Sequence, residues 1–166
     1  MRGIGDQMRI TILCVGKCKE KFYSDAAAEY LKRLSRYVKV QIIEVDDEKT
    51  PDGASERETE LILDKEASRL EKHIPDDAYV IALAVGGKEY TSPEFADRIN
   101  KLALGGRSHI IFIIGGSLGL ADRIYKRADE QIGFGKMTFP HRLFRVMLLE
   151  QVYRAYRIIN NEPYHK

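Results

Sequence analysis

Four short runs of apolar residues constrain the fold of this chain more than any other feature of its sequence. They lie at 9–15, 38–45, 79–85 and 109–114, are rich in β-branched residues, and alternate with segments that have the apolar spacing of helices. Strands without polar alternation are typical of parallel sheets covered on both faces. The pattern therefore predicts an α/β fold, a mostly parallel sheet with helices on both faces.

The connecting segments complete this prediction. Helices are expected at 20–36 and 56–73, and from Thr91, where a hydroxyl, an early proline and Glu94 form a capping signal, to Gly105-Gly106. The last third is predicted to hold a helix at 122–131, a short strand at 137–139, and a final helix from Pro140 to Asn160-Asn161.

Length favours one domain. The 166 residues can bury a core without disulfides or metals, and we expect a single domain over 8–166. Residues 1–7 show no pattern and are expected to be a disordered extension or a remnant of expression. No apolar run approaches the roughly 18 residues of a membrane span. Lysines follow the first apolar run without a small-residue cleavage site, so we expect no signal peptide. We therefore expect a cytoplasmic protein that does not bind membranes.

The final helix is apolar around most of its circumference. From Leu143 to Ile159 its polar residues are few, and Glu150, Arg154, Arg157 and Asn161 lie on one narrow stripe. A surface helix usually has an apolar stripe about a third of its circumference wide. The helix is either deeply buried within one chain or also packed against a second subunit, and in a domain of this size we expect a homodimer.

The two cysteines do not indicate a metal site. Cys14 lies in an apolar run, Cys18 follows four residues later, and the nearest histidine is His73. A structural zinc site needs about four ligands, so we expect no metal.

The sequence Gly115-Gly116-Ser117-Leu118-Gly119 follows a predicted strand and matches the G-x-S-x-G nucleophile elbow of hydrolases. A small serine hydrolase is therefore an alternative, although only 49 residues follow Ser117 to supply the acid and the histidine. The spacing does not fit a dinucleotide fingerprint. Together with Gly86-Gly87 and residues 134–139, these glycines predict a ligand crevice at the carboxyl ends of the strands.

Basic residues gather in two stretches that could form one phosphate-binding surface. Residues 17–39 hold seven basic and three acidic residues, and residues 136–166 hold six and two. The second stretch also contains His141, Arg142, Arg154, Tyr164 and His165. Arginines beside aromatic side chains suit contacts to RNA phosphates and bases.

An ordered set of motifs extends from Met8 to the last residue. It comprises Met8-Arg9-Ile10-Thr11-Ile12, Val15-Gly16-Lys17, Leu83, Ile114-Gly115-Gly116-Ser117 with Gly119-Leu120, Lys136-Met137-Thr138-Phe139-Pro140-His141, Arg145-Val146, Glu150-Gln151-Val152-Tyr153-Arg154-Ala155 and Pro163-Tyr164-His165-Lys166. With this set, the chain resembles the ribosomal large subunit methyltransferase H family (RlmH), in the SPOUT class of S-adenosylmethionine-dependent RNA methyltransferases.

The resemblance implies a C-terminal trefoil knot, a homodimer with active sites near its interface, and methylation of N3 of a pseudouridine in helix 69 of 23S rRNA on the assembled ribosome. It places the methyl donor, S-adenosylmethionine, in a pocket lined by Leu83, Gly115, Phe134, Gly135, Lys136, Met137, Thr138 and Phe139.

The resemblance also implies the candidate residues on the RNA side, which are His141, Arg142, Arg154, Tyr164 and His165. We expect His141 or His165 to accept the N3 proton and Arg142 to stabilise the anionic base. The alternatives are that His141 orients its turn and that His165 stacks on RNA. A non-catalytic ribosome-binding module remains a further alternative to the enzyme.

Overall fold

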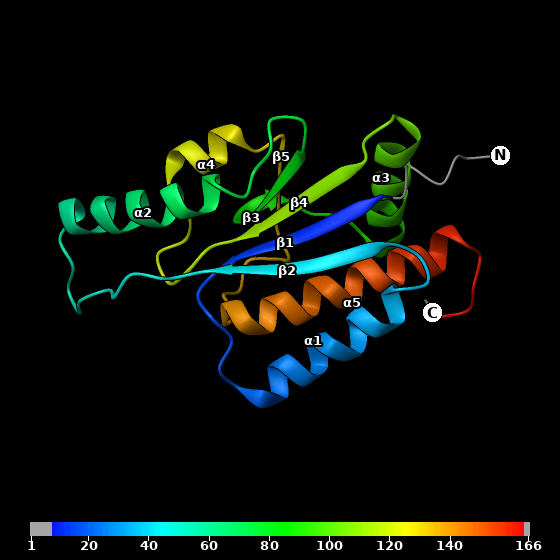
Figure 1. Ribbon diagram of the computed structural model, residues 1–166, viewed down its shortest axis with the longest axis horizontal. Helices are drawn as coiled ribbons and strands as arrows, with labels where there is room; N and C mark the ends of the chain where they lie inside the picture. Colours follow the sequence, from blue (N-terminus) through cyan, green and yellow to red (C-terminus); the bar gives the residue numbers. More distant parts are fainter. Residues whose placement is uncertain (1–7, 165–166) are drawn as a thin grey trace.

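A five-stranded parallel sheet organises the computed structural model, which describes residues 8–164 (Figure 1). The strands are β1 Arg9–Val15, β2 Lys39–Val45, β3 Tyr79–Lys88, β4 His109–Ile114 and β5 Glu130–Ile132, in the spatial order β2-β1-β4-β3-β5. The helices are α1 Lys21–Leu34, α2 Glu56–Glu71, α3 Ser92–Leu104, α4 Asp122–Arg127 and α5 His141–Ile159. This confirms the predicted α/β fold class with its parallel sheet.

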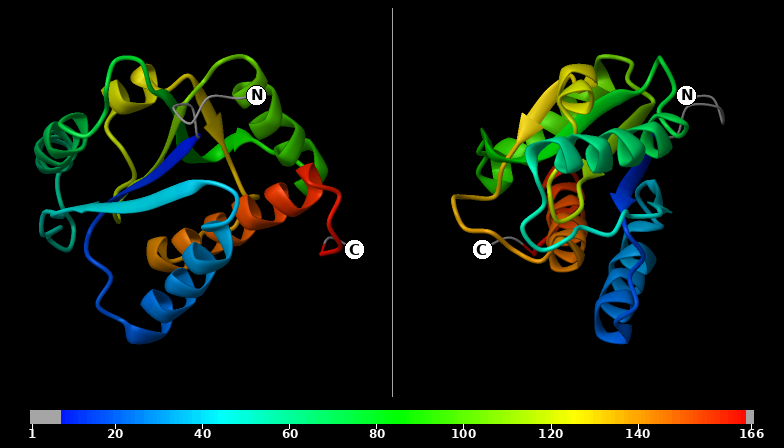
Figure 2. Two further views of the ribbon diagram at one scale, coloured as in Figure 1. Left: turned by 45° about the vertical axis from the view of Figure 1, so that its right-hand side comes forward. Right: turned by 90° about the vertical axis from the view of Figure 1, so that its left-hand side faces the viewer.

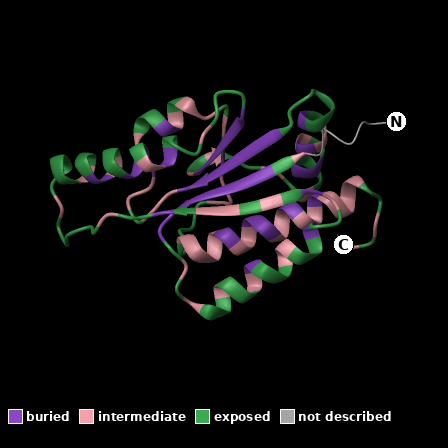
Figure 3. Ribbon diagram, viewed as in Figure 1, coloured by how far each residue is buried: buried purple, intermediate pink, exposed green. Residues whose placement is uncertain are grey.

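Helices cover both faces of the sheet, and two apolar clusters form as a result. Along β4, Phe112 packs toward α1, α3 and α5, whereas Ile111 and Ile113 pack toward α2 and α4. Figures 1 and 2 show the two helical layers, and Figure 3 shows that β1 and β4 are buried while β2 lies at a partly exposed edge. Burial on both sides explains why the central strands lack polar alternation.

The order of the strands reverses between β1 and β4. From β1 the chain first adds β2 on one side, and then returns so that β4 pairs with β1 on the other. Open α/β sheets leave a crevice at the carboxyl ends of strands at such a point. The fold therefore brings the turn after β1, at Gly16, and the turn after β4, at Gly115, to one edge.

The prediction for residues 122–139 was wrong in two places. The helix ends at Arg127 rather than near Gln131, and the short strand is β5, not 137–139. Asp129 turns the chain into the sheet: its N–H donates to Val80 O (2.8 Å), and its carboxylate accepts from Val80 N–H (2.8 Å). Pairing with β3 thus overrides the local helical tendency, which tertiary contacts often do.

β3 continues to Lys88, three residues beyond its predicted end, and there approaches β5 again. Gly87 lies so close to Ile132 that a Cβ at residue 87 would be 2.7 Å from the carbonyl carbon of Ile132. Just beyond, Gly133 N–H donates to Lys88 O (3.1 Å). The end of β3 and the end of β5 are therefore closely packed, an arrangement consistent with the expected knot.

The final helix α5 lies between α1 and α3 and packs on the sheet (Figure 2). Leu148, Leu149 and Val152 are completely buried within the chain. Contacts within one chain therefore cover part of the apolar surface from which we expected a second subunit. Among the helices of residues 8–164, none is long and apolar enough to cross a membrane. The expected extension at 1–7 lies outside the described residues.

We predict that Gly87→Ala lowers the free energy of unfolding by about 3 kcal/mol, the upper end of the cost of overpacking, because the added methyl meets rigid backbone. Gly53→Ala is the control: Gly53 has φ +69° and open space, so only backbone strain of about 1 kcal/mol is expected. Urea denaturation measures both. Equal costs for the two variants would contradict the close approach of β3 and β5.

Candidate active site

A cavity of about 290 Å³ opens at the carboxyl edge of the sheet, beside the ends of β3 and β4. Five segments form it: the second half of β3, the glycine turn after β4, helix α4, the loop at 133–140, and the first turn of α5. Its lining residues are Leu83, Ala84, Val85, Ile114, Gly115, Gly116, Gly119, Tyr125, Phe134, Gly135, Met137, Phe139, His141 and Phe144.

The glycine turn leaves no room for side chains on its inner side. A Cβ on Gly115 would lie 2.5 Å from Gly119 O, and Gly119 itself has φ +81°. Gly119 N–H closes the turn by donating to Gly116 O (3.1 Å). This tight turn lets a ligand approach the backbone closely, which favours recognition through main-chain groups.

Three phenylalanines form an apolar wall of the cavity. The rings of Phe134 and Phe139 meet Phe144 edge to face, with centroids 5.0 and 5.9 Å away. Such mutually packed rings hold their orientation without polar contacts. The wall therefore suits a flat, weakly polar ligand group such as a purine ring.

His141, the first residue of α5, lies between the cavity and the turn after β1. Its Nε2 is 3.7 Å from the position that a Cβ on Gly16 would occupy. Burial lowers the pKa of His141 below its ordinary value, and the positive charges of Arg142 and Arg145 lower it further, against the carboxylates of Asp47 and Glu20. The imidazole is therefore neutral at neutral pH and can accept a proton.

Arg145, one turn further along α5, is only 4% exposed and joins both neighbouring strand ends. It donates to the Glu44 carboxylate at the end of β2 (2.7 Å) and to Gly16 O after β1 (3.4 Å). Arg142 donates to Lys17 O (3.1 Å) and the Glu20 carboxylate (3.0 Å). The two arginines thus fix the segment after β1 against the first turn of α5.

A further set of hydrogen bonds attaches residues 46–50 to the glycine turn and to α2. The Glu66 carboxylate of α2, which is 5% exposed, accepts from Glu48 N–H (3.0 Å) and lies next to Gly116. Arg69 donates to Asp46 O (2.9 Å). The hydroxyls of Thr50 and Ser117 share a hydrogen bond of 3.2 Å.

Most of the expected donor-pocket residues line this cavity. Leu83, Gly115, Phe134, Gly135, Met137 and Phe139 meet there together with His141, whereas Lys136 and Thr138 belong to the same loop but are exposed and do not line it. Gly86 and Gly87, which we expected to form one side of the crevice, do not line it either.

The expected RNA-side residues fall into two groups. Arg142 follows the cavity residue His141 but does not itself line the cavity, while Arg154 and Tyr164 meet further along α5, with the guanidinium 4.6 Å from the ring centroid. His165 lies outside the described residues.

Sequence reasoning missed two cavity residues from different segments, Tyr125 of α4 and Phe144 of α5. Neither belongs to a motif that could have indicated it. The fold alone brings them to the cavity.

The exposed Ser117 does not form the arrangement of the alternative serine hydrolase within residues 8–164. Its hydroxyl is paired with Thr50, and no hydrogen bond there joins it to a histidine. A larger polar groove, of about 780 Å³, lies beside α3 and β5, but its central groups, Tyr79, Arg98 and Glu130, are bonded to one another. The smaller cavity is the better candidate.

Comparison with known proteins agrees with this geometry. A family model described as "Predicted SPOUT methyltransferase" matches residues 8–165. The chain is 60% identical over 159 residues to a ribosomal RNA large subunit methyltransferase H of Bifidobacterium adolescentis, and 58% identical to one of Clostridium botulinum strain Okra. Each alignment covers 96% of this chain and all of the relative.

Solved structures share the fold at low sequence identity. A protein of Haemophilus influenzae Rd KW20 described as "a probable methylase family protein" has a TM-score of 0.52 at 14% identity, and the match covers 97% of this chain and 71% of that one. One of Neisseria gonorrhoeae has a TM-score of 0.53 at 12% identity, with coverage of 89% and 82%.

We predict that the stability of Glu66→Gln relative to the wild type increases as the pH rises. Burial raises the pKa of Glu66, against the hydrogen bond from Glu48 N–H and the charge of Arg69. A carboxyl with a raised native pKa destabilises the native state once it ionises, and glutamine removes that charge while it keeps an acceptor for Glu48 N–H.

Thermal unfolding of both proteins between about pH 4 and pH 8 measures this difference. Glu60→Gln, an exposed change on the same helix, is the control and should show no such trend. A stability difference between Glu66→Gln and the wild type that stays constant with pH would contradict the prediction.

Proposed function

Because this chain belongs to the ribosomal RNA large subunit methyltransferase H family of SPOUT methyltransferases, we propose that it transfers the methyl group of S-adenosylmethionine to N3 of a pseudouridine in helix 69 of 23S rRNA on the assembled ribosome. The observation that carries the proposal is the cavity. It joins the glycine turn, the 134–139 loop and His141, which are distant from one another in the sequence.

The cavity fits the donor in size and in chemistry. Its volume of about 290 Å³ is close to the lower end, roughly 300 Å³, of small-molecule sites. Leu83 and the phenylalanine wall would hold the adenine, and the backbone of Gly115 and Gly135 would lie against its polar edges. Lys136 and Thr138 would shape the same loop from outside the cavity, while Met137 and Phe139, which alternate with them, line it.

The bound donor supplies an electrophilic methyl group on a sulfonium, so the protein's part is mainly to position the base and to manage its proton. The neutral His141 accepts the N3 proton at the edge of the cavity. Arg142 stabilises the negative charge that develops on the ring oxygens. His165 is the other candidate for the proton acceptor.

The RNA partner contacts a surface that includes Arg142, Arg154, Tyr164 and His165. Tyr164 and Arg154 already lie against each other, and a tyrosine beside an arginine suits a splayed base and its phosphate. The enzyme acts as a homodimer, in which a second subunit covers the apolar side chains of α5 that remain half-buried, such as Met147 and Ile158. It works in the cytoplasm, where ribosomes are.

We predict saturable binding of S-adenosylmethionine in a calorimetric titration, with the chain mass in solution equal to that of a dimer. In Gly115→Ala the new methyl would collide with Gly119, so affinity should fall about tenfold or more. Ser117→Ala changes an exposed residue outside the lining and should keep both binding and methyl transfer. Loss of activity in Ser117→Ala alone would instead favour the hydrolase.

We predict that His141→Ala lowers the single-turnover rate of methyl transfer by about 10²-fold or more, the usual contribution of a positioned base. The pKa of His141 is lowered from 6.5, so the wild-type rate should fall with acidification only below that pH, where the imidazole becomes protonated. His73→Ala, at an exposed site, is the control. A rate that survives in both His141→Ala and His165→Ala would rule out a histidine base.

A further inference from the structure

The chain reverses direction directly after α5. Asn161 has φ +54° and is the one non-glycine residue with positive φ in residues 8–164. Glu162 N–H donates to Arg157 O (2.9 Å), and Asn161 N–H donates to Ile158 O (3.0 Å). This pair of hydrogen bonds is the Schellman motif, which ends a helix and turns the chain back along it.

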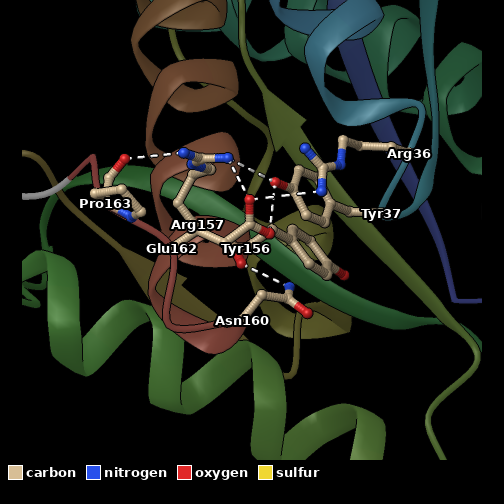
Figure 4. Close-up of polar contacts among 7 residues, drawn as sticks. All are labelled: Arg36, Tyr37, Tyr156, Arg157, Asn160, Glu162 and Pro163. Carbon is tan, nitrogen blue, oxygen red and sulfur yellow. Dashed lines mark hydrogen bonds and ion pairs between the residues drawn. The ribbon is translucent and has the colours of Figure 1, made fainter.

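An ionic cluster takes the place of the apolar contact that usually accompanies this motif (Figure 4). The Glu162 carboxylate forms an ion pair with Arg157 and accepts a hydrogen bond from the Tyr37 hydroxyl (3.0 Å). Arg157 also donates to Tyr37 Oη (3.1 Å) and to Pro163 O (2.9 Å). We call Tyr37, Arg157 and Glu162 the latch.

The latch joins three separate parts of the chain. Tyr37 lies in the turn between α1 and β2, Arg157 in the last turn of α5, and Glu162 in the segment that follows the helix. The side chains of Arg157 and Glu162 are only 17% and 25% exposed, so solvent screens this pair less than an ion pair on the open surface. Arg36 adds a second positive charge, 3.5 Å from Glu162.

Beyond the latch, the chain runs back along α5 and places Tyr164 on its middle. The Tyr164 hydroxyl donates to the Glu150 carboxylate (3.1 Å), nine residues before the helix ends, which is roughly 14 Å along its axis. Its ring meets Tyr153 edge to face (centroids 4.9 Å apart) and lies 4.6 Å from the Arg154 guanidinium. The segment after α5 is thus held at Glu162 by the latch and at Tyr164 by the middle of the helix.

We propose that the latch residues Tyr37, Arg157 and Glu162 are positioning residues that hold Tyr164 against Arg154 in a ready-made surface for the RNA substrate. The inference rests on the proposed function, because it assigns this surface to RNA binding. Ordering a segment before binding removes an entropic cost that the RNA contacts would otherwise have to offset. The cavity proposed for the donor adjoins the opposite end of α5, so loss of the latch should leave donor binding unchanged.

The test compares Glu162→Ala, Glu162→Gln and the wild type in methyl transfer to ribosomes that lack the modification. Glu162→Ala removes the acceptor and should raise the KM for ribosomes about five- to tenfold, while the donor Kd stays within about twofold. Glu162→Gln keeps an oxygen for the Tyr37 hydroxyl and should show a smaller rise. Asn160→Ala, an exposed change at the same helix end, should leave both constants unchanged.

Two kinetic outcomes would overturn the proposal. One is a KM for ribosomes that stays unchanged in Glu162→Ala. The other is a loss of donor affinity as large as the rise in that KM, which would indicate general damage to the fold. A second readout is independent of activity. The NMR order parameter of the Tyr164 amide should fall from about 0.85 to below about 0.6 in Glu162→Ala, while that of Val152 does not change.

The two readouts separate the latch from the proposed function. If the wild type methylates no ribosome, the proposed function fails, and with it the assignment of this surface to RNA. A fall in order at Tyr164 would then still support the latch as the device that holds this segment. Unchanged order at Tyr164 would refute the latch whatever the kinetics show.

Discussion

The rest of the candidate site depends on the hydrogen bonds of one buried group, the guanidinium of Arg145. It reaches from α5 to Gly16 O at the end of β1 and to Glu44 at the end of β2, so one side chain connects two strand ends with the helix that carries His141. Such a buried pair contributes little net stability, because both charges lose their hydration, but removal of one partner leaves the other uncompensated. Its value here is geometric: it sets where α5 begins relative to the sheet.

The other ion pairs of α5 fit this position of the helix against the sheet. Arg142, one turn before Arg145, donates from Nε to Lys17 O and from Nη1 to Glu20, which holds the first turn of α5 against the segment after β1. The Glu150–Arg154 pair at the middle of α5 and the latch groups at its far end play a similar part. Each part of the helix is thus organised by its own set of ion pairs.

Sequence reasoning predicted the elements whose burial is strongest and missed those that depend on distant partners. The runs at 9–15 and 109–114 are buried on both faces, so their composition alone identified them. β5 is three residues long, contains Glu130, and forms only because β3 lies beside it, so no local pattern indicates it. The cavity followed the same rule: the glycine turn was visible in the sequence, whereas Phe144 and Tyr125 reach the cavity through the tertiary fold.

Cys14 and Cys18, the only cysteines of the chain, differ in a way that bears on chemical labelling. Burial raises the pKa of Cys14 to about 12, so its thiol stays protonated and out of reach of reagents. Cys18 is partly exposed, and its own N–H donates to Glu44, the partner of Arg145. A thiol-reactive fluorophore would therefore attach to one side chain of the unaltered protein, directly beside the Glu44–Arg145 pair that joins the sheet to α5.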